Sequence, residues 1–335
     1  MLKIAHDYSL AAHNSFGIDA KARLFVEYDD AESLQEYIKS SLTLPVLHIG
    51  GGNNLLFTRD FEGTVLHSRI KGKELLQIDD STYVVMLRVG AAEVWDDFVG
   101  WCLDQGYYGL ENLSLIPSEV GAAAVQNIGA YGSEAKDFIH SVECVDLSTG
   151  EKTVFSNSDC CFAYRFSNFK GAWAGRFAIT HVTFCLSTTF KPNLTYRALQ
   201  DRNAEDVATA FSLRQTVIAI RRSKLPEPSE LGNAGSFFMN PVVSRQQFES
   251  LQKDYPDIPH FPAADGVKVP AAWLIEQSGW KGRTLGRAGV YERQPLVLVN
   301  RGGATSQEIV DLAKAVIADV ENMFGITLRP EVMYM

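Results

Sequence analysis

Short apolar segments separated by turns dominate the first half of the chain. Several are rich in β-branched and aromatic residues, which predicts strands. The predicted strands are Arg23–Tyr28, Val46–Ile49, Thr64–His67, Tyr83–Val89, Ser141–Asp146 and Phe177–Leu186. Helical spacing of apolar residues in Ala31–Ser40 and Ala92–Asp104 predicts helices between them. The mixture favours an α+β fold.

Two further helices are predicted in the second half. The sequence Asn203-Ala204-Glu205-Asp206 resembles a capping box, and apolar residues recur at helical spacing until Pro226, which predicts a helix that connects two domains. Thr305 and Glu308 form a second such box, and Gly325 is placed to end the helix that follows. We expect this last helix to pack in a core.

A glycine-rich bend, Gly50-Gly51-Gly52-Asn53-Asn54, separates two apolar runs. Glycine permits positive φ and close approach of a ligand to main-chain N–H groups, so the bend suits a diphosphate. It lacks the third glycine and following helix of a dinucleotide fingerprint, and the Gly-Lys-Ser/Thr of a P-loop. An ordinary strand turn is the alternative.

Composition points to a globular, soluble chain with small-molecule partners. The 335 residues are 46% hydrophobic and 21% charged, which predicts two or three domains. The net charge of −9 disfavours nonspecific binding of nucleic acid. We find no apolar run of membrane-spanning length and no signal-peptide core. Five cysteines without metal-like spacing indicate a reduced, cytoplasmic protein without a metal site.

Candidate chemistry begins in the segment Ile116–Gly132, which combines small residues with Gln126 and Asn127. Small residues let a flat ring system approach, and amide side chains and N–H groups can hydrogen-bond its edge, as in flavin sites. A tightly packed helix and turn is the other interpretation. Further along, Arg165 lies in a strand-like run of aromatic and apolar residues, where it requires either a structural or a substrate carboxylate.

Three polar positions near the second half of the chain could also act on a ligand. Ser236 follows a glycine and precedes two phenylalanines; it fits a proton donor better than a nucleophile, with a turn serine as the alternative. Lys224 closes a basic helix end that already complements the helix dipole, yet could reach a phosphate. Glu331 lies in a terminal strand, where a carboxylate is either paired or functional.

Taken together, the motifs resemble the UDP-N-acetylenolpyruvoylglucosamine reductase (MurB) family over nearly the whole chain. A further segment, Asn193–Tyr196, is similar to the longer form of the family, which carries a tyrosine loop over the substrate. The residues that carry the resemblance are Asn14–Phe16, Gly50–Asn54, Ile116–Pro117, Val120–Gly121, Gln126–Gly132, Tyr164–Arg165, Gly232–Phe238, Asn240–Pro241 and Pro330–Val332.

The resemblance implies a two-part FAD-binding domain of the vanillyl-alcohol-oxidase/PCMH type and a C-terminal α+β substrate-binding domain. We expect the two FAD-binding subdomains at 1–70 and 71–204, and a connector helix with the C-terminal domain at 205–335. The last strand, near 328–335, is expected to return to the FAD domain. The protein is expected to be a monomer.

The resemblance also implies an activity: NADPH reduces non-covalently bound FAD, which reduces UDP-N-acetylglucosamine enolpyruvate to UDP-N-acetylmuramate in peptidoglycan precursor synthesis. Arg165 and Glu331 match positions that stabilise the substrate carboxylate, Glu331 as a protonated donor, and Ser236 matches the proton donor. The positions matching FAD-binding residues are Gly50, Gly51, Gly52, Asn53, Asn54, Ile116, Gln126, Asn127, Gly129, Ala130 and Tyr131. Those matching substrate-binding residues are Tyr164, Tyr196, Lys224, Asn240 and Gln294.

Two other functions are compatible with parts of the pattern. One is another flavoprotein oxidase of the same superfamily, with FAD attached covalently to a histidine such as His48. The other is a non-enzymatic nucleotide-binding regulator, against which Arg165, Ser236 and Glu331 argue. Asn53, Ser118, Ala124 and Met239 depart from the residues expected in the family, which affects details of the FAD and substrate contacts.

Overall fold

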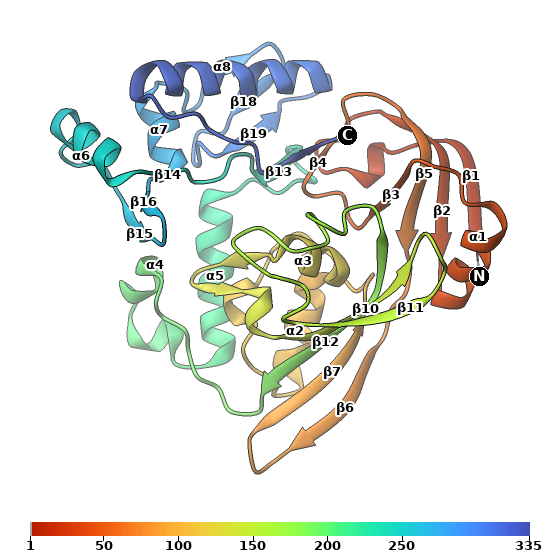
Figure 1. The fold of residues 1–335 in the computed structure, drawn as a ribbon. Coiled ribbons are helices and arrows are strands. Elements are labelled where there is room, and N and C mark those ends of the chain that lie inside the picture. The colour runs from red at the N-terminus through yellow and green to blue at the C-terminus, as the bar shows by residue number, and fades with distance from the viewer. Residues whose placement is uncertain (1) are drawn as a thin grey trace. The chain divides into compact units, whose positions relative to one another are not determined.

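The computed structural model describes residues 2–335, which separate into two compact units (Figure 1). Of the described residues, unit 1 comprises 2–8, 22–51 and 61–221, and unit 2 comprises 9–21, 52–60 and 222–335. Two short N-terminal segments therefore belong to the same unit as the C-terminal third. The functional division into 1–70, 71–204 and 205–335 stays a prediction.

The first sheet of unit 1 has four strands in the order β1 (Leu2–Ser9), β2 (Lys21–Tyr28), β5 (Phe61–Ser68) and β3 (Val46–Ile49). Strands β2 and β3 both run parallel to β5. Helix α1 (Ala31–Ser41) begins at Asp30, whose carboxylate accepts a hydrogen bond from the Ser33 N–H, and it connects β2 to β3. Its Leu34 and Tyr37 are buried against residues of β2 and β5.

The second sheet of unit 1 is antiparallel, in the order β11 (Lys152–Ser156), β10 (Ile139–Asp146), β12 (Phe177–Ser187), β7 (Val84–Gly90) and β6 (Lys73–Asp79). Helices α2 (Trp95–Asp104) and α3 (Val120–Gln126) share its apolar core, in which Trp95, Phe98 and Phe184 lie close together. A short hairpin of β8 (Gly129–Ala130) and β9 (Ser133–Glu134) follows α3.

Two helices follow this sheet, α4 (Arg197–Gln200) and α5 (Ala210–Lys224). A bidentate ion pair from Arg214 to Asp96 of α2, with N···O distances of 2.6 and 3.0 Å, fixes α5. The helix predicted to start at Asn203 is wrong in its first turns. A short 3-10 helix occupies Ala204–Val207, Asn203 makes no side-chain cap, and Thr209 instead exchanges two hydrogen bonds with Ser212 to begin α5.

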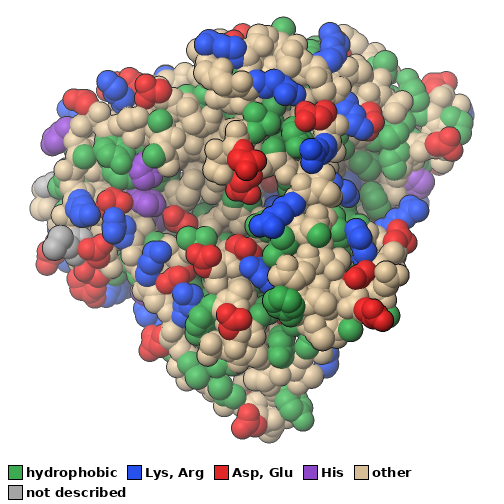
Figure 2. Space-filling model, turned by 180° about the vertical axis from the view of Figure 1, so that it is seen from behind, with side chains coloured by type: hydrophobic (Ala, Val, Ile, Leu, Met, Phe, Trp, Pro, Cys, Tyr) green, Lys and Arg blue, Asp and Glu red, His purple; other side chains and the backbone are tan. Residues whose placement is uncertain are grey.

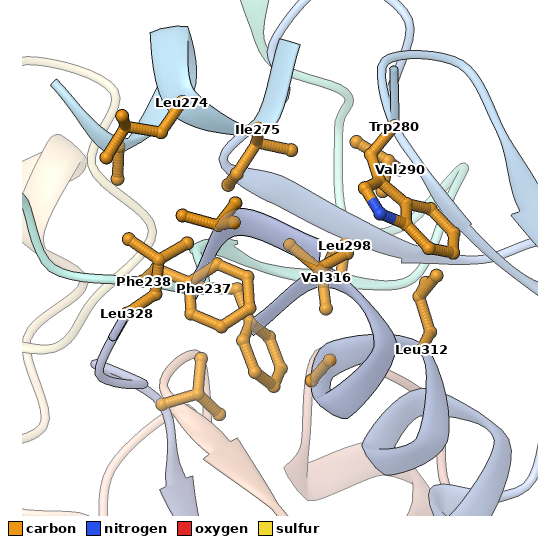
Figure 3. Packing of buried hydrophobic residues seen from close by; sticks show 14 of the residues in the cluster. Phe237, Phe238, Leu274, Ile275, Trp280, Val290, Leu298, Leu312, Val316 and Leu328 are labelled. Atoms are coloured by element: carbon orange, nitrogen blue, oxygen red, sulfur yellow. The ribbon is translucent and has the colours of Figure 1, made fainter. Parts of the chain in front are cut away.

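Unit 2 is built around a sheet in the order β13 (Asn233–Ser236), β19 (Val297–Asn300), β18 (Ala288–Val290) and β17 (Thr284–Leu285). Helix α8 (Ser306–Phe324) lies across β18 and β19 (Figure 1) and packs with α7 (Ala271–Gln277). Figure 3 shows the resulting core, with Phe237, Phe238 and Val316 among its buried side chains.

Two small sheets complete unit 2. Strands β14 (Val242–Val243), β16 (Gly266–Lys268) and β15 (Phe261–Ala263) form one of them, beside α6 (Arg245–Asp254). The other pairs β4 (Leu55–Leu56) in parallel with β20 (Met333–Tyr334). The C-terminal strand therefore joins the segment that directly follows the glycine-rich bend.

Candidate functional site

The glycine-rich bend is packed so tightly that two of its positions exclude a side chain. Gly52 has φ +65°, and a Cβ there would lie 1.9 Å from the carbonyl oxygen of His13. A Cβ on Gly50 would lie 3.0 Å from the Cβ of Ala122 and 3.1 Å from a carboxylate oxygen of Glu119. The bend thus brings bare main chain close to its neighbours.

The N–H groups of the bend are available to a ligand. Within residues 2–335, the main-chain N–H groups of Gly51, Gly52 and Asn53 donate no hydrogen bond to a protein acceptor. Main-chain donors are normally paired, and successive unpaired N–H groups in a turn attract anions. This arrangement favours the interpretation as an anion-binding loop over that as an ordinary strand turn.

Asn54, at the end of the bend, connects to the C-terminal segment within unit 2. Its side-chain amide donates to the main-chain oxygen of Glu331 at 3.2 Å, and its own carbonyl oxygen accepts from the N–H of Met333 at 3.0 Å. The Asn54 side chain is therefore engaged with the protein, and the bond places Glu331 beside the end of the bend.

The segment after α3 turns sharply at Asn127, which is buried with φ +47°. Its amide nitrogen donates to Glu134 Oε2 at 3.0 Å and to the Ala163 oxygen at 2.8 Å, while its oxygen accepts from the Lys136 N–H at 3.0 Å. These partners occupy both amide protons. The predicted role of Asn127 as a ligand contact is therefore restricted to its main chain.

Lys170 orients Gln126, the last residue of α3. The Lys170 ammonium donates to Gln126 Oε1 at 2.6 Å and to the main-chain oxygen of Arg165 at 3.1 Å. A lysine can only donate, so it fixes which end of the Gln126 amide is the oxygen and turns the NH₂ group elsewhere. The role of Lys170 has no local signal in the sequence, because its partner lies 44 positions earlier.

Arg165 lies in a turn, and the prediction of a strand-like run for Cys161–Ser167 is wrong. Ala163 and Phe166 exchange two main-chain hydrogen bonds, and Arg165 has φ +55°. The Ser167 hydroxyl donates to the Val125 oxygen at 2.7 Å, which ties this turn to α3. Tertiary hydrogen bonds therefore override the local β preference of the sequence.

The Arg165 side chain reaches the β8–β9 hairpin. Its Nη2 donates to the Gly129 oxygen at 2.7 Å, and a Cβ on Gly129 would lie 3.0 Å from its Nη1. The guanidinium carbon lies 5.3 Å from the ring centroid of Tyr164, which is exposed. The structure thus brings together four predicted site residues from two segments: Gln126, Gly129, Tyr164 and Arg165.

A loop carrying Tyr196 packs on the same hairpin. The rings of Tyr131 and Tyr196 meet edge to face with centroids 5.3 Å apart, and a Cβ on Gly132 would lie 2.4 Å from Thr195 Oγ1. Buried Asn112, which the sequence analysis did not single out, donates to the main-chain oxygens of Tyr131 and Asn193 at 2.7 and 2.8 Å. Burial raises the pKa of the Tyr131 phenol, so the hydroxyl stays protonated at neutral pH.

Two other residues of unit 1 that are predicted to bind the cofactor, Ile116 and Ala130, lie near the ends of α3 in the sequence. Ala130 belongs to the β8–β9 hairpin and packs against the core of the five-stranded sheet, as does Ile116. Both are partly buried. Of the predicted cofactor residues, Ile116 therefore precedes α3 in the sequence and Ala130 follows it, and both contribute to the same apolar core.

Unit 2 brings together Ser236 and Glu331. Ser236 ends β13 opposite Val297, and the N–H of Glu331 donates to the oxygen of the adjacent Phe237 at 2.8 Å. Gly235, with φ +68°, donates its N–H to Asn233 Oδ1 at 2.9 Å and makes the turn that positions Ser236. Glu331 lies two residues before β20 rather than inside it.

The remaining residues of unit 2 that are predicted to bind substrate lie in three different structural environments. Asn240 Oδ1 accepts from the Ala271 N–H at the start of α7 at 2.9 Å, which leaves its NH₂ group for other partners. Gln294 lies in the turn that leads into β19, where its main-chain oxygen accepts from the Val297 N–H at 3.0 Å. Lys224 is exposed at the last position of α5.

Residues 2–335 contain no group of three or more His, Cys, Asp or Glu side chains that could hold a metal ion. None of the helices in that range is both long enough and apolar enough to cross a bilayer. Figure 2 shows acidic and basic side chains interspersed over one face of the molecule.

Comparison with known proteins gives two matched family domains. Residues 22–156 match the family described as an FAD binding domain, and residues 227–335 match the C-terminal domain of UDP-N-acetylenolpyruvoylglucosamine reductase. A protein of that name from Bacteroides fragilis is 50% identical over 98% of both chains. One from Porphyromonas gingivalis is 48% identical over 99% of both chains. The chain belongs to the UDP-N-acetylenolpyruvoylglucosamine reductase (MurB) family.

The fold agrees with this assignment. The crystal structure of the MurB from Thermus caldophilus superposes with a TM-score of 0.69 at 20% identity, covering 100% of this chain and 98% of that one. The predicted fold class, an α+β FAD-binding part followed by a C-terminal reductase domain, is confirmed. This chain is thus an FAD-binding oxidoreductase of the MurB family.

Proposed function

We propose that the protein catalyses the NADPH-dependent reduction of UDP-N-acetylglucosamine enolpyruvate to UDP-N-acetylmuramate, as a cytoplasmic monomer in peptidoglycan precursor synthesis. The observation that carries this proposal is the 50% identity to a reductase of this name over 98% of both chains. The arrangements around Arg165 in unit 1 and around Ser236 and Glu331 in unit 2 support it.

The residues of the glycine-rich bend fit the FAD diphosphate. Within residues 2–335, the N–H groups of Gly51, Gly52 and Asn53 have no protein acceptor. The missing side chains at Gly50 and Gly52 let the bend pack against Ala122 and the His13 carbonyl, which holds its main chain in place. Gln126, with Gly129, Ala130 and Tyr131, would border the ring system, and Ile116 and the main chain of Asn127 would add contacts. Non-covalently bound FAD would supply the hydride equivalents taken from NADPH.

Arg165 and Glu331 would stabilise the substrate during reduction. Addition of hydride to the terminal vinyl carbon places negative charge on the adjacent carbon and, by delocalisation, on the carboxylate. A guanidinium and a protonated carboxyl group that hydrogen-bond this carboxylate stabilise the charge as it develops. Arg165 has the required fork of donors, held by its bond to Gly129.

Ser236 would complete the reaction by donating its hydroxyl proton to the carbon next to the one that received hydride. A serine hydroxyl is a weak acid, but the carbanion is a strong base, so the transfer is favourable. The serine then regains a proton from water, which balances the reaction.

Five further residues are proposed to bind the diphosphate and sugar of the substrate. Lys224 supplies a cation, Asn240 and Gln294 supply amide donors, and Tyr164 and Tyr196 supply exposed aromatic side chains. Asn240 would contact the substrate through its NH₂ group, because its side-chain oxygen already accepts a hydrogen bond from the Ala271 N–H.

The alternative of an oxidase with FAD attached to His48 is disfavoured by geometry. His48 Nε2 lies 2.7 Å from the hydroxyl of buried Tyr28, and burial lowers the pKa of His48 to about 4. A flavin bond at Nε2 would require this contact to break. The mass of denatured protein tests this directly, because covalent FAD would add its own mass to that of the chain.

An anaerobic visible spectrum tests the proposed function. We expect purified holoprotein to show oxidised flavin, to bleach with NADPH, and to recover its colour on addition of UDP-N-acetylglucosamine enolpyruvate. A protein without flavin, or one that only oxygen reoxidises, would contradict the proposal.

A further inference from the structure

His67, near the end of β5, is held between two carboxylates of unit 1. Its Nδ1 lies 3.3 Å from Glu27 Oε1 on β2, and its Nε2 lies 3.4 Å from Glu119 Oε1 before α3. The three side chains are only 15 to 19% exposed. A carboxylate on each ring nitrogen is satisfied best when both nitrogens carry a proton, which is the imidazolium form.

Glu119 connects this histidine to the glycine-rich bend. Glu119 occupies the N-cap position of α3 but makes no capping hydrogen bond with its side chain. Its second oxygen, Oε2, lies 3.1 Å from where a Cβ on Gly50 would be. Since β3 and β5 are parallel with Ile49 opposite His67, the bend starts directly beside this histidine.

The carboxylate of Glu119 disfavours binding of an anion in the glycine-rich bend unless a cation compensates its negative charge. A carboxylate next to a loop with unpaired N–H groups repels a diphosphate, and partial burial weakens solvent screening of that repulsion. Among residues 2–335, the basic side chain in contact with Glu119 is His67.

The other charged and titratable groups around His67 do not replace it. Arg69, which follows β5, lies 3.4 Å from Glu27 and 3.4 Å from Asp29, so its charge serves these two carboxylates. His48 on β3 is held neutral at physiological pH, because burial and the charge of His67 lower its pKa to about 4. Its partner Tyr28, on β2, is buried and uncharged.

We propose that His67 is a positioning residue for FAD: its imidazolium neutralises Glu119 beside the glycine-rich bend, so that loss of the His67 proton weakens binding of the FAD diphosphate. The inference rests on the proposed function, in that FAD occupies this bend. It adds to that function a dependence of FAD affinity on the protonation of His67, a side chain that need not contact the diphosphate.

The direction of the pH effect follows from linkage. Burial opposes the charged form, but the hydrogen bonds and charges of Glu119 and Glu27 outweigh it and raise the pKa of His67 above its ordinary value of 6.5. A bound diphosphate favours the charged form still more. FAD affinity is therefore full below the raised pKa, falls as the pH increases through it, and FAD binding in that range takes up a proton.

The experiment is an equilibrium titration of apoprotein with FAD, followed by flavin fluorescence from about pH 6 to about pH 9. It compares wild type, His67→Gln, Glu119→Gln and the double variant, with His140→Gln on the exposed end of β10 as a matched control. Circular dichroism verifies folding. Calorimetry of wild type in two buffers of different ionisation enthalpy counts the protons taken up and needs no variant.

We expect the Kd of wild type for FAD to rise about tenfold across this pH range. The Kd of His67→Gln should be about tenfold higher than that of wild type at the acidic end and should not change with pH. The double variant should return to within about twofold of the wild-type acidic value. Glu119→Gln removes the repelling carboxylate and should therefore bind FAD more tightly than wild type at the basic end, and His140→Gln should match wild type. Equal Kd values and pH profiles for wild type and His67→Gln, or no proton uptake, would overturn the inference while leaving the proposed function intact. Wild type that binds no FAD at any pH would overturn both.

Discussion

The side-chain amide of Asn54 bonds the main-chain oxygen of Glu331 at 3.2 Å, across 277 positions of sequence. The N–H of the same Glu331 bonds the oxygen of Phe237, the neighbour of Ser236. The end of the glycine-rich bend, the proposed proton donor and the proposed carboxylate ligand therefore share one hydrogen-bonded path through unit 2.

Asn54→Ala should loosen this path. Loss of a half-buried side-chain hydrogen bond costs about 1 kcal/mol in the free energy of unfolding, which urea denaturation can measure. The variant also removes a hydrogen bond that holds the main chain at Glu331, the proposed ligand of the substrate carboxylate. We therefore expect slower reoxidation of the reduced enzyme by substrate, while flavin reduction by NADPH stays near the wild-type rate. Gln307→Ala, which removes an exposed hydrogen bond to Asp311 on α8, is the control and should change neither. Equal loss of both half-reactions in Asn54→Ala would contradict the path.

Gly52→Ala and Gly17→Ala form a matched pair in unit 2. Both glycines have φ near +65°, but a Cβ on Gly52 would clash with the His13 carbonyl, whereas Gly17 has open space. Left-handed backbone alone costs an alanine about 1 kcal/mol, and the clash adds to it, so Gly52→Ala should lose about 3 kcal/mol or fail to fold. Similar denaturation midpoints for the two variants would show that the main chain of His13 yields easily.

Ser236→Ala should separate the two half-reactions. Under the proposed mechanism, flavin reduction by NADPH remains near normal, because no proton from Ser236 is needed, while reoxidation by the enolpyruvyl substrate slows by orders of magnitude. Anaerobic stopped-flow absorbance of the flavin measures both steps. Ser229→Ala, in an exposed turn, serves as a control. A variant that loses both steps to the same extent would remove Ser236 from its role as proton donor.

His48 should make the fold sensitive to acid. Burial lowers its pKa to about 4 from 6.5, so between these values the unfolded chain binds a proton that the folded protein does not. Stability is therefore lost as the pH falls through this range, by up to about 3 kcal/mol in total. His48→Gln, which can still bond the Tyr28 hydroxyl, should show a shallower decrease in urea titrations over the same range.

The exposed His6→Asn variant is the control for this measurement and should keep the wild-type slope. Parallel pH profiles for wild type and His48→Gln would mean that His48 is accessible enough to accept a proton in the folded state.

The sequence predicted correctly those elements whose ends are determined by residues at the ends themselves, such as helix caps. Helix α8 begins at the capping box of Thr305 and Glu308 and ends at Gly325, which has φ +63°, so the prediction is confirmed at both ends. The expected helix at Asn203 failed because a second cap, from Thr209, competes for the start of α5. Phe211, one of the apolar residues that suggested helical spacing in this segment, is exposed.

Side-chain positions that depend on distant partners were not predictable from the sequence. Two side-chain hydrogen bonds hold the turn at Arg165. Asn127 donates to the Ala163 oxygen, 36 positions away, and Ser167 donates to the Val125 oxygen, 42 positions away. His67 likewise looked like an ordinary strand residue, since Glu27 and Glu119 lie far from it in sequence. The resemblance to the family supplied the candidate residues, and the structure supplied which of them are neighbours.

The pairing of β4 with β20 has a consequence for biosynthesis. Residues 55–58 leave the ribosome early, but their strand partner and the oxygen that pairs with the Thr58 N–H belong to residues 333–335. Until residues 333–335 have been made, this stretch, with its apolar Leu55, Leu56 and Phe57, is without its native strand partner. The sheets of unit 1 can form before that point, whereas unit 2 can close only after it, and the incomplete unit stays accessible to chaperones and proteases in the meantime.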